Sequence, residues 1–208
     1  MIELFSSDTP NGKKITIMLE EVGCDFQVTK IDLSKDEQLK PEFKKLSPFG
    51  KIPVIKDHEN GVSVFESGAI LMYLAEKYNK FYELKDRTII NQWLMAQMGT
   101  IGPMFGQHHQ FHHYNPGKSK FGEERFFKIT KRLYGELDER LATSKYLAGP
   151  NYTIADIATW PWIARHEWHD IGLKNFKNLR KWYLEIASRE AVIKGYNLMK
   201  NGSEIPKA

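Results

Sequence analysis

Two kinds of hydrophobic periodicity divide this chain of 208 residues near residue 80. Strand-like and helix-like segments alternate before that point, and only helix-like spacing follows it. The expected elements of the first part are, in chain order, a strand at 2–6, a helix at 15–22, a strand at 26–31, a short helix at 41–46, strands at 52–55 and 62–65, and a helix at 69–77. A strand–helix–strand unit gives a parallel pair through a right-handed crossover, whereas a short turn gives an antiparallel hairpin. A small mixed α/β domain is therefore expected first.

The second part of the chain is expected to be all-helical. Apolar spacing predicts helices at 87–98, 123–141, 154–169 and 179–187. The charge balance changes at the same place, from 11 lysines against 13 acids before residue 81 to 19 bases against 13 acids after it. The expected organisation is an α/β domain at 1–80, a linker at 81–85, an all-α domain at 86–200 and a polar, frayed tail at 201–208.

The composition is that of an ordinary globular protein, with 41% hydrophobic and 27% charged residues. It excludes a mostly disordered chain, a collagen and a disulfide scaffold. No apolar run approaches the roughly 18–20 residues of a membrane span, and the first residues lack the pattern of a secretory signal. A single cysteine cannot form an internal disulfide, which favours a reducing cytoplasm. Bases in the second part alternate with acids, so neither nucleic acid nor membrane is an expected partner.

Three motifs, taken with this order of elements, carry a family resemblance. They are KIPV at 51–54, FESGAI at 65–70 and NYTIAD at 151–156. The chain resembles the glutathione transferase family over nearly its whole length. TPNG at 9–12 and GPMFGQHH at 102–109 make it more similar to the bacterial Nu-class group within that family. The resemblance implies a thioredoxin-like first domain, a helical-bundle second domain and a homodimer.

The TPNG segment suits the activation of a thiol. A thiol with a pKa of about 8.5 is mostly protonated at neutral pH, and a helix N-terminus or a hydrogen-bond donor favours its thiolate. Thr9 is a good helix cap, and Thr9 and Asn11 can both donate hydrogen bonds to sulfur. Taken alone, the segment is better explained as an ordinary helix cap. The resemblance implies catalytic roles for Thr9 and Asn11, with Ser7 as a rival to Thr9.

Glu66 and Ser67, between a strand and a helix, suit the amino-acid end of a ligand. Ser67 can cap the helix, and its hydroxyl and the following N–H groups can hold a carboxylate. Glu66 can accept a hydrogen bond from an ammonium group. A capped helix with a surface glutamate is the alternative. The resemblance implies that the ligand is glutathione, held at its γ-glutamyl end.

Further glutathione contacts follow from the resemblance alone. The residues concerned are Gln38, Lys51, Ile52, Pro53 and Arg132. The bond before Pro53 is expected to be cis, which would turn the backbone of Ile52 toward the ligand. Arg132 is expected to reach the ligand of its own or of the other subunit. Without the resemblance, Gln38, Lys51 and Arg132 would be interpreted as surface residues.

Four of the seven histidines lie between residues 108 and 113. No acid or cysteine stands among them, so no metal site is expected. Met104, Phe105, His108 and His109 are instead expected to line an acceptor pocket, where His108 or His109 could protonate a leaving thiolate. Partly buried histidines at a helix end, without a chemical role, are the alternative.

Two other features are expected to serve the fold. Cys24 follows the C-terminal end of the first helix, where the helix dipole has the wrong sign for a thiolate, so it is interpreted as a packing residue. Thr153 and Asp156 match a capping box with Asp in place of Glu. The tryptophans at 160, 162, 168 and 182 are expected in the core.

The expected activity is glutathione-dependent reduction of disulfide bonds, with weak transferase and peroxidase activity, as in the Nu group. The segment at the first helix carries neither the tyrosine nor the cysteine used by other branches of the family, since position 5 is Phe. The attacking sulfur must then belong to bound glutathione. Two alternatives stay open: a conjugating transferase for small electrophiles, and a non-catalytic glutathione-binding regulatory protein.

Overall fold

A computed structural model describes residues 1–199 and 204–208 of the chain. Its first part contains β1 (Ile2–Ser6), α1 (Pro10–Val22), β2 (Phe26–Lys30), the 3-10 turns η1 (Leu33–Lys35) and η2 (Glu37–Leu39), α2 (Pro41–Lys44), β3 (Val54–Asp57), β4 (Ser63–Phe65) and α3 (Ser67–Tyr78). The strands form one mixed sheet in the order β2-β1-β3-β4. β1 is parallel to β2, and β3 is antiparallel to both β1 and β4, so the predicted parallel pair and hairpin are confirmed.

The two faces of the sheet are covered by different helices. Ile2 and Leu4 of β1 are fully buried in the core that includes α1 and α3. Phe5, which points to the other face, packs edge-on against Phe43 of α2 with ring centroids 6.5 Å apart. β3 begins later than predicted, at Val54, because Pro53 has no N–H to donate to a neighbouring strand.

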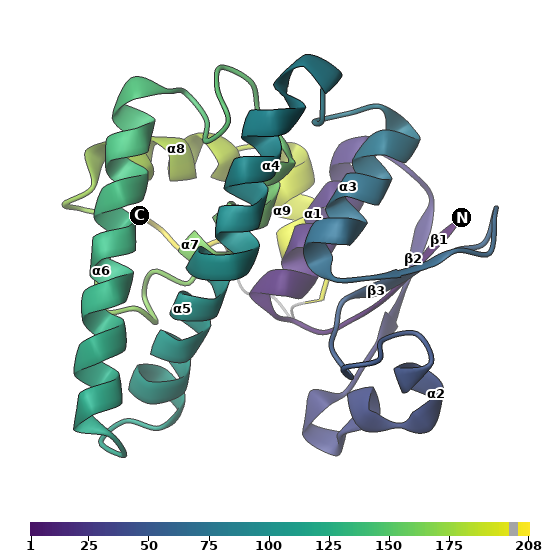
Figure 1. Ribbon diagram of the computed structural model, residues 1–208, viewed down its shortest axis with the longest axis horizontal. Helices are drawn as coiled ribbons and strands as arrows, with labels where there is room; N and C mark the ends of the chain where they lie inside the picture. Colours follow the sequence, from purple (N-terminus) through teal and green to yellow (C-terminus); the bar gives the residue numbers. More distant parts are fainter. Residues whose placement is uncertain (200–203) are drawn as a thin grey trace.

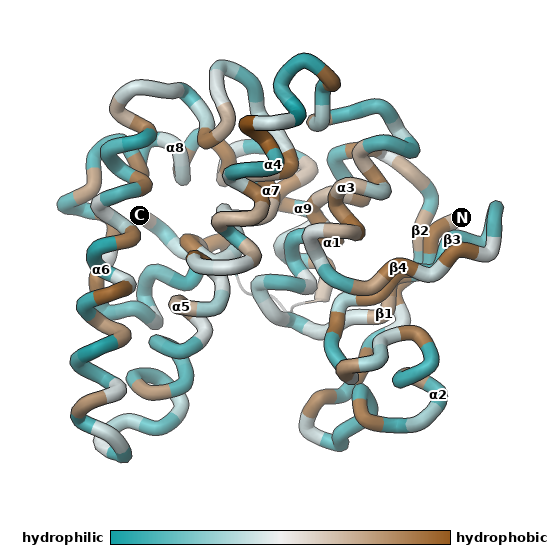
Figure 2. Tube along the Cα trace, viewed as in Figure 1, coloured by the Kyte–Doolittle hydropathy of each residue, from teal (hydrophilic) through white to brown (hydrophobic). Residues whose placement is uncertain are grey.

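As far as the structure describes it, the second part consists of helices joined by turns and loops, with one isolated β-bridge between Tyr146 and Gly149. Its elements are η3 (Leu84–Asp86), α4 (Arg87–Ala96), the π-helical η4 (Gln97–Ile101), α5 (Gly102–His108), the π-helical η5 (His109–Tyr114), α6 (Lys120–Thr143), α7 (Ile154–Ile163), α8 (Lys177–Ala187) and α9 (Glu190–Asn197). α1 lies against α3 on one side and α7 and α9 on the other, so the two parts share one core (Figures 1 and 2). None of the described helices is both long and apolar enough to span a membrane.

α9, which the sequence analysis did not predict, crosses α1 at very close range. A Cβ added to Gly195 would lie 2.6 Å from the Cα of Ile17, and the Thr16 hydroxyl donates to the Gly195 carbonyl oxygen at 2.7 Å. Only glycine allows the two backbones this separation. The contact fixes the second part of the chain against the helix that opens the first.

The predicted helix at 154–169 is wrong beyond Ile163. The chain continues as tight turns, in which the N–H groups of Arg165 and His166 donate to the carbonyl oxygens of Trp162 and Ile163 at 3.1 and 2.9 Å. Such turns advance the chain with nearly helical spacing, so the apolar pattern does not show where α7 ends. The capping box at its start, formed by Thr153 and Asp156, is confirmed.

The expectation of a frayed tail is wrong for residues 204–208. The Tyr183 hydroxyl donates to the Pro206 carbonyl oxygen at 2.7 Å, and Ile205 and Ala208 pack against the core. Residue 200, at the end of the predicted all-α domain, and residues 201–203 of the predicted tail lie outside the described residues.

Candidate functional site

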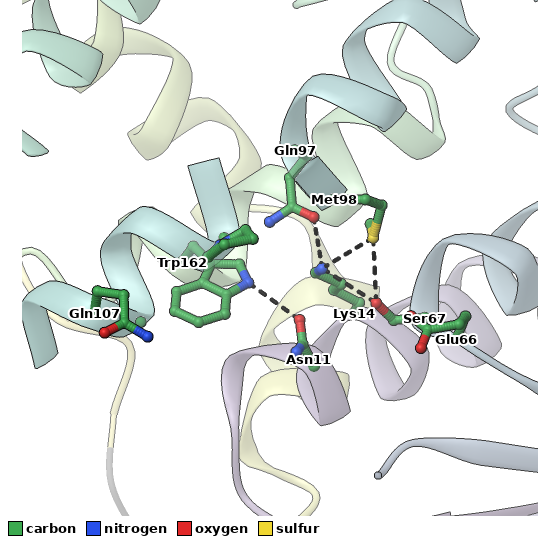
Figure 3. A pocket seen from close by; sticks show the side chains of 11 residues that line it. Asn11, Lys14, Glu66, Ser67, Gln97, Met98, Gln107 and Trp162 are labelled. Carbon is green, nitrogen blue, oxygen red and sulfur yellow. Dashed lines mark hydrogen bonds between the residues drawn. The ribbon is translucent and has the colours of Figure 1, made fainter. Parts of the chain in front are cut away.

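A cleft of about 300 Å³ opens where the two parts of the chain meet (Figure 3). The N-terminal ends of α1 and α3 form one side, and η4, α5 and α7 form the other. Its polar lining side chains are Asn11, Lys14, Glu66, Ser67, Gln97, Gln107 and Trp162. The N-terminal end of a helix carries a partial positive charge and free N–H groups, so this cleft favours an anionic ligand.

Thr9 and Asn11 stand together at the start of α1. The Thr9 hydroxyl oxygen accepts from the Gly12 N–H at 3.1 Å, which leaves the hydroxyl proton for another acceptor. Asn11 Oδ1 accepts from Trp162 Nε1 at 3.2 Å. An indole N–H can only donate, so Trp162 engages the amide oxygen and leaves the Nδ2 group of Asn11 as a donor. Asn11 lines the cleft, whereas Thr9 lies just outside its lining.

Ser7 and Cys24 are both occupied elsewhere. Ser7 is buried and donates its hydroxyl to the carbonyl oxygen of Ile31, so its proton is engaged within the fold. Cys24 lies beyond the opposite end of α1, about 20 Å from Asn11 by helix geometry. It packs against the core, and burial raises the pKa of its thiol, so its interpretation as a packing residue is confirmed.

Glu66 and Ser67 begin α3, but in a different arrangement from the predicted one. Glu66, not Ser67, holds the N-cap position, with φ at 71°. A residue other than glycine in this region is strained by about 1–3 kcal/mol. Ser67 is the first helical residue, and its buried hydroxyl accepts from Lys14 Nζ at 3.2 Å instead of capping the helix. The turn places a carboxylate and a hydroxyl side by side at the cleft.

Lys14, Gln97 and Met98 are cleft residues that the sequence analysis missed. Lys14 is 1% exposed, and its Nζ donates to Gln97 Oε1 at 2.6 Å and approaches Met98 Sδ at 3.9 Å (Figure 3). One signal could have found Lys14. The start of α1 has no acid in its first turn and two adjacent lysines, which is opposite to the charge pattern that a helix dipole favours.

Four residues predicted to bind glutathione lie outside the lining of this cleft. Gln38 is half-buried on η2, and Lys51 is exposed, with its backbone N–H and carbonyl held by the Ser47 hydroxyl at 3.0 and 2.8 Å. The bond between Ile52 and Pro53 is cis, as the resemblance implied. All four lie in the segment between β2 and β3.

Arg132 is also separate from the cleft. It lies on α6, where its side chain is 66% exposed and forms an ion pair with Glu136 at 3.5 Å. An exposed pair one helical turn apart contributes little to stability.

The residues predicted for an acceptor pocket do not line the cleft, which corrects that part of the site. The cleft face of α5 is formed by Gly102, Pro103, Gly106 and Gln107. Met104, Phe105, His108 and His109 are not among the residues that line the cleft. Phe105 and His108 are fully buried, and His109 stacks behind Trp162 with ring centroids 5.8 Å apart.

The buried histidines are poor proton donors. Burial, together with the charge of Arg165, lowers the pKa of His109 to about 3. Burial also lowers the pKa of His108 and takes that of His169 well below its usual value. They are therefore uncharged at neutral pH, and their environment favours the interpretation as structural histidines over proton donors. Among the residues that the structure describes, no group of three His, Cys, Asp or Glu side chains is arranged to hold a metal ion.

Two family models match the sequence of this chain. Residues 2–76 match the model of the glutathione S-transferase N-terminal domain, and residues 95–190 match that of the C-terminal domain. The chain belongs to the glutathione transferase family. Its fold, a thioredoxin-like mixed sheet followed by a helical domain, is that of the family, as predicted.

Individual relatives resemble the chain over nearly its full length. The disulfide-bond oxidoreductase YfcG of Escherichia coli (strain K12) is 44% identical over 207 residues, which cover 96% of this chain and 95% of that protein. A glutathione transferase from Burkholderia graminis, solved with two glutathione molecules bound per subunit, is 38% identical with a TM-score of 0.90, covering 97% of this chain and 89% of the other. One from Pseudomonas putida, with one glutathione disulfide bound per subunit, is 39% identical with a TM-score of 0.89, covering 97% and 92%.

Proposed function

We propose that this protein is a glutathione-dependent disulfide-bond oxidoreductase with weak transferase and peroxidase activity. The observation that carries the proposal is that the cleft brings two helix N-termini and the Asn11 amide together, while Cys24, the one cysteine of the chain, lies at the opposite end of α1. The nucleophilic sulfur must then come from a co-substrate. The name of the E. coli relative and the ligands of the solved relatives support glutathione in that role.

The reaction proceeds by thiolate exchange. The thiolate of bound glutathione attacks one sulfur of the substrate disulfide, so that a mixed disulfide forms as the substrate bond breaks, and the departing sulfur takes up a proton. A second glutathione thiolate attacks the mixed disulfide and releases the other half of the substrate as a thiol. Two glutathione molecules give up two electrons to become glutathione disulfide, and the substrate disulfide gains them.

Different residues at the cleft activate the glutathione thiol and bind its γ-glutamyl end. The Asn11 amide and the Thr9 hydroxyl donate to the thiolate at the positive end of α1. Ser67 holds the carboxylate of the γ-glutamyl end, and Glu66 accepts from its ammonium group. The oxygens of Thr9 and Asn11 accept hydrogen bonds within the fold, which leaves their protons for the ligand. The Ser7 proton is engaged, so the proposal gives Ser7 no catalytic role.

The remaining predicted contacts complete the proposal. Gln38, Lys51, Ile52 and Pro53 bind the cysteinyl and glycyl part of glutathione from the segment between β2 and β3. Arg132, exposed on α6, reaches the ligand of the other subunit of a homodimer. The single cysteine favours a cytoplasmic location.

The test compares two reactions of one protein. Glutathione-driven reduction of a small disulfide, coupled to a reductase that regenerates glutathione, is measured beside conjugation of glutathione to an aryl halide. Fast reduction with slow conjugation is expected, and the Asn11→Ala variant should lose about tenfold or more of the reduction rate. Fast conjugation with negligible reduction would identify a conjugating transferase instead. Glutathione binding without either reaction would identify a regulatory protein.

A further inference from the structure

Lys14 is a buried lysine that lines the cleft. Its side chain is 1% exposed, and no carboxylate of the described residues lies within ion-pair distance of its Nζ. Burial lowers the pKa of the Lys14 ammonium group well below its usual value, and Glu66 opposes this shift only through its charge. A ligand carboxylate placed beside Nζ would therefore favour the charged form of Lys14 and be held by it.

The hydrogen bonds of Lys14 place the site for such a carboxylate at the start of α3. Gln97 Oε1 and Ser67 Oγ both accept from Nζ, at 2.6 and 3.2 Å. Because the Ser67 hydroxyl oxygen accepts from Lys14, its proton points to another acceptor. Within the described part of the chain the hydroxyl donates to Met98 Sδ at 3.6 Å, and a thioether is a weak acceptor that a carboxylate can replace (Figure 3). The hydroxyl proton and the first N–H groups of α3 therefore form a cradle for a carboxylate.

Glu66 lies directly beside this cradle, and its carboxylate has the opposite charge to the Lys14 ammonium group. Lys14 and Ser67 can bind a carboxylate of the ligand, and the carboxylate of Glu66 can bind an ammonium group next to it. This arrangement matches a ligand whose carboxylate and ammonium groups share one carbon atom. Resting on the proposed function, we propose that Lys14 determines specificity for the γ-glutamyl end of glutathione. It supplies the counter-charge for the α-carboxylate and holds the Ser67 hydroxyl in the orientation that binds it.

The test measures binding of three ligands whose thiol is blocked by a methyl group. They are S-methylglutathione, its analogue with a 4-aminobutyryl group in place of the γ-glutamyl group, and its glycinamide analogue. Only the second lacks the α-carboxylate, and only the third lacks the glycyl carboxylate. In calorimetric titration of the full chain, the 4-aminobutyryl analogue should bind at least about 30-fold more weakly than S-methylglutathione.

Two variants should remove this preference. Lys14→Met keeps the length of the side chain without its charge, and we expect it to distinguish the first two ligands by less than about threefold. Gln97→Glu puts a carboxylate where Gln97 Oε1 lies, 2.6 Å from Nζ, and should compensate Lys14 internally with the same result. The control Gln107→Glu adds the same charge to the cleft without a contact to Lys14, and should keep the wild-type ratio. The ratio for the glycinamide analogue should be the same in every variant.

Each outcome bears on a different part of the reasoning. Thermal unfolding first establishes that the variants are folded, and if Lys14→Met is not, Gln97→Glu decides the question. A wild-type preference that survives in the folded variants overturns the role of Lys14 and leaves the proposed function intact. If the wild-type protein binds none of the three ligands, the proposed function itself fails.

Discussion

Acidification is expected to destabilise the protein through the histidines behind the cleft. His109 is 5% exposed, between the rings of Trp162 and His169, and burial holds its pKa at about 3 in the folded state. The usual value of 6.5 applies when the chain unfolds. Between these two values the unfolded chain binds a proton that the folded protein does not, so stability falls as the pH falls below 6.5. At pH 5 this single group accounts for about 2 kcal/mol.

Urea unfolding at neutral pH and at pH 5 measures this effect directly. In the His109→Phe variant an aromatic ring remains beside Trp162, but the titrating group is gone. The wild-type protein should lose about 2 kcal/mol more of its free energy of unfolding between the two pH values than the variant loses. His108 and His169 remain in both proteins, so their contributions cancel in the comparison. Equal losses in the two proteins would refute the assignment of the acid sensitivity to His109.

Three further predictions concern single contacts. Trp162→Phe removes the indole N–H that orients Asn11, so it should raise the thiol pKa of bound glutathione and reduce the rate of disulfide reduction about tenfold. The ultraviolet absorbance of the thiolate measures the change in pKa. Glu66→Gly should relieve the strain at φ 71°, raising the free energy of unfolding by up to about 1 kcal/mol while weakening glutathione binding in a calorimetric titration. Gly195→Ala should lose about 1–3 kcal/mol in urea unfolding because its Cβ meets the α1 backbone, whereas Gly135→Ala, which meets nothing within 4 Å, should not.

Features that depend on neighbouring residues were accessible from the sequence. Alternation of apolar residues predicted the strands, and the short turn before β4 predicted the antiparallel hairpin. The capping box at Thr153 and Asp156 was found because its two hydrogen bonds join residues three positions apart. The cis bond before Pro53 came from the family resemblance, since the general preference of such bonds is trans.

Features that depend on distant residues were not accessible. The bond between Asn11 and Trp162 joins residues 151 positions apart, and that between Lys14 and Gln97 joins residues 83 positions apart. No helix was predicted at 102–108, where α5 lies, and the predicted pocket residues His108 and His109 are buried outside the cleft lining. Which face of a helix is buried depends on the elements that pack against it. A single sequence does not specify which helices pack together.

The central claim is that glutathione, and no sulfur of the protein, attacks the disulfide. The Cys24→Ala variant has no thiol at all, because Cys24 is the one cysteine of the chain. Its rate of glutathione-driven disulfide reduction, measured beside that of the wild-type protein, is the most direct test. The account predicts equal rates for the two proteins. A rate that falls to background in Cys24→Ala, with the variant folded, would contradict it.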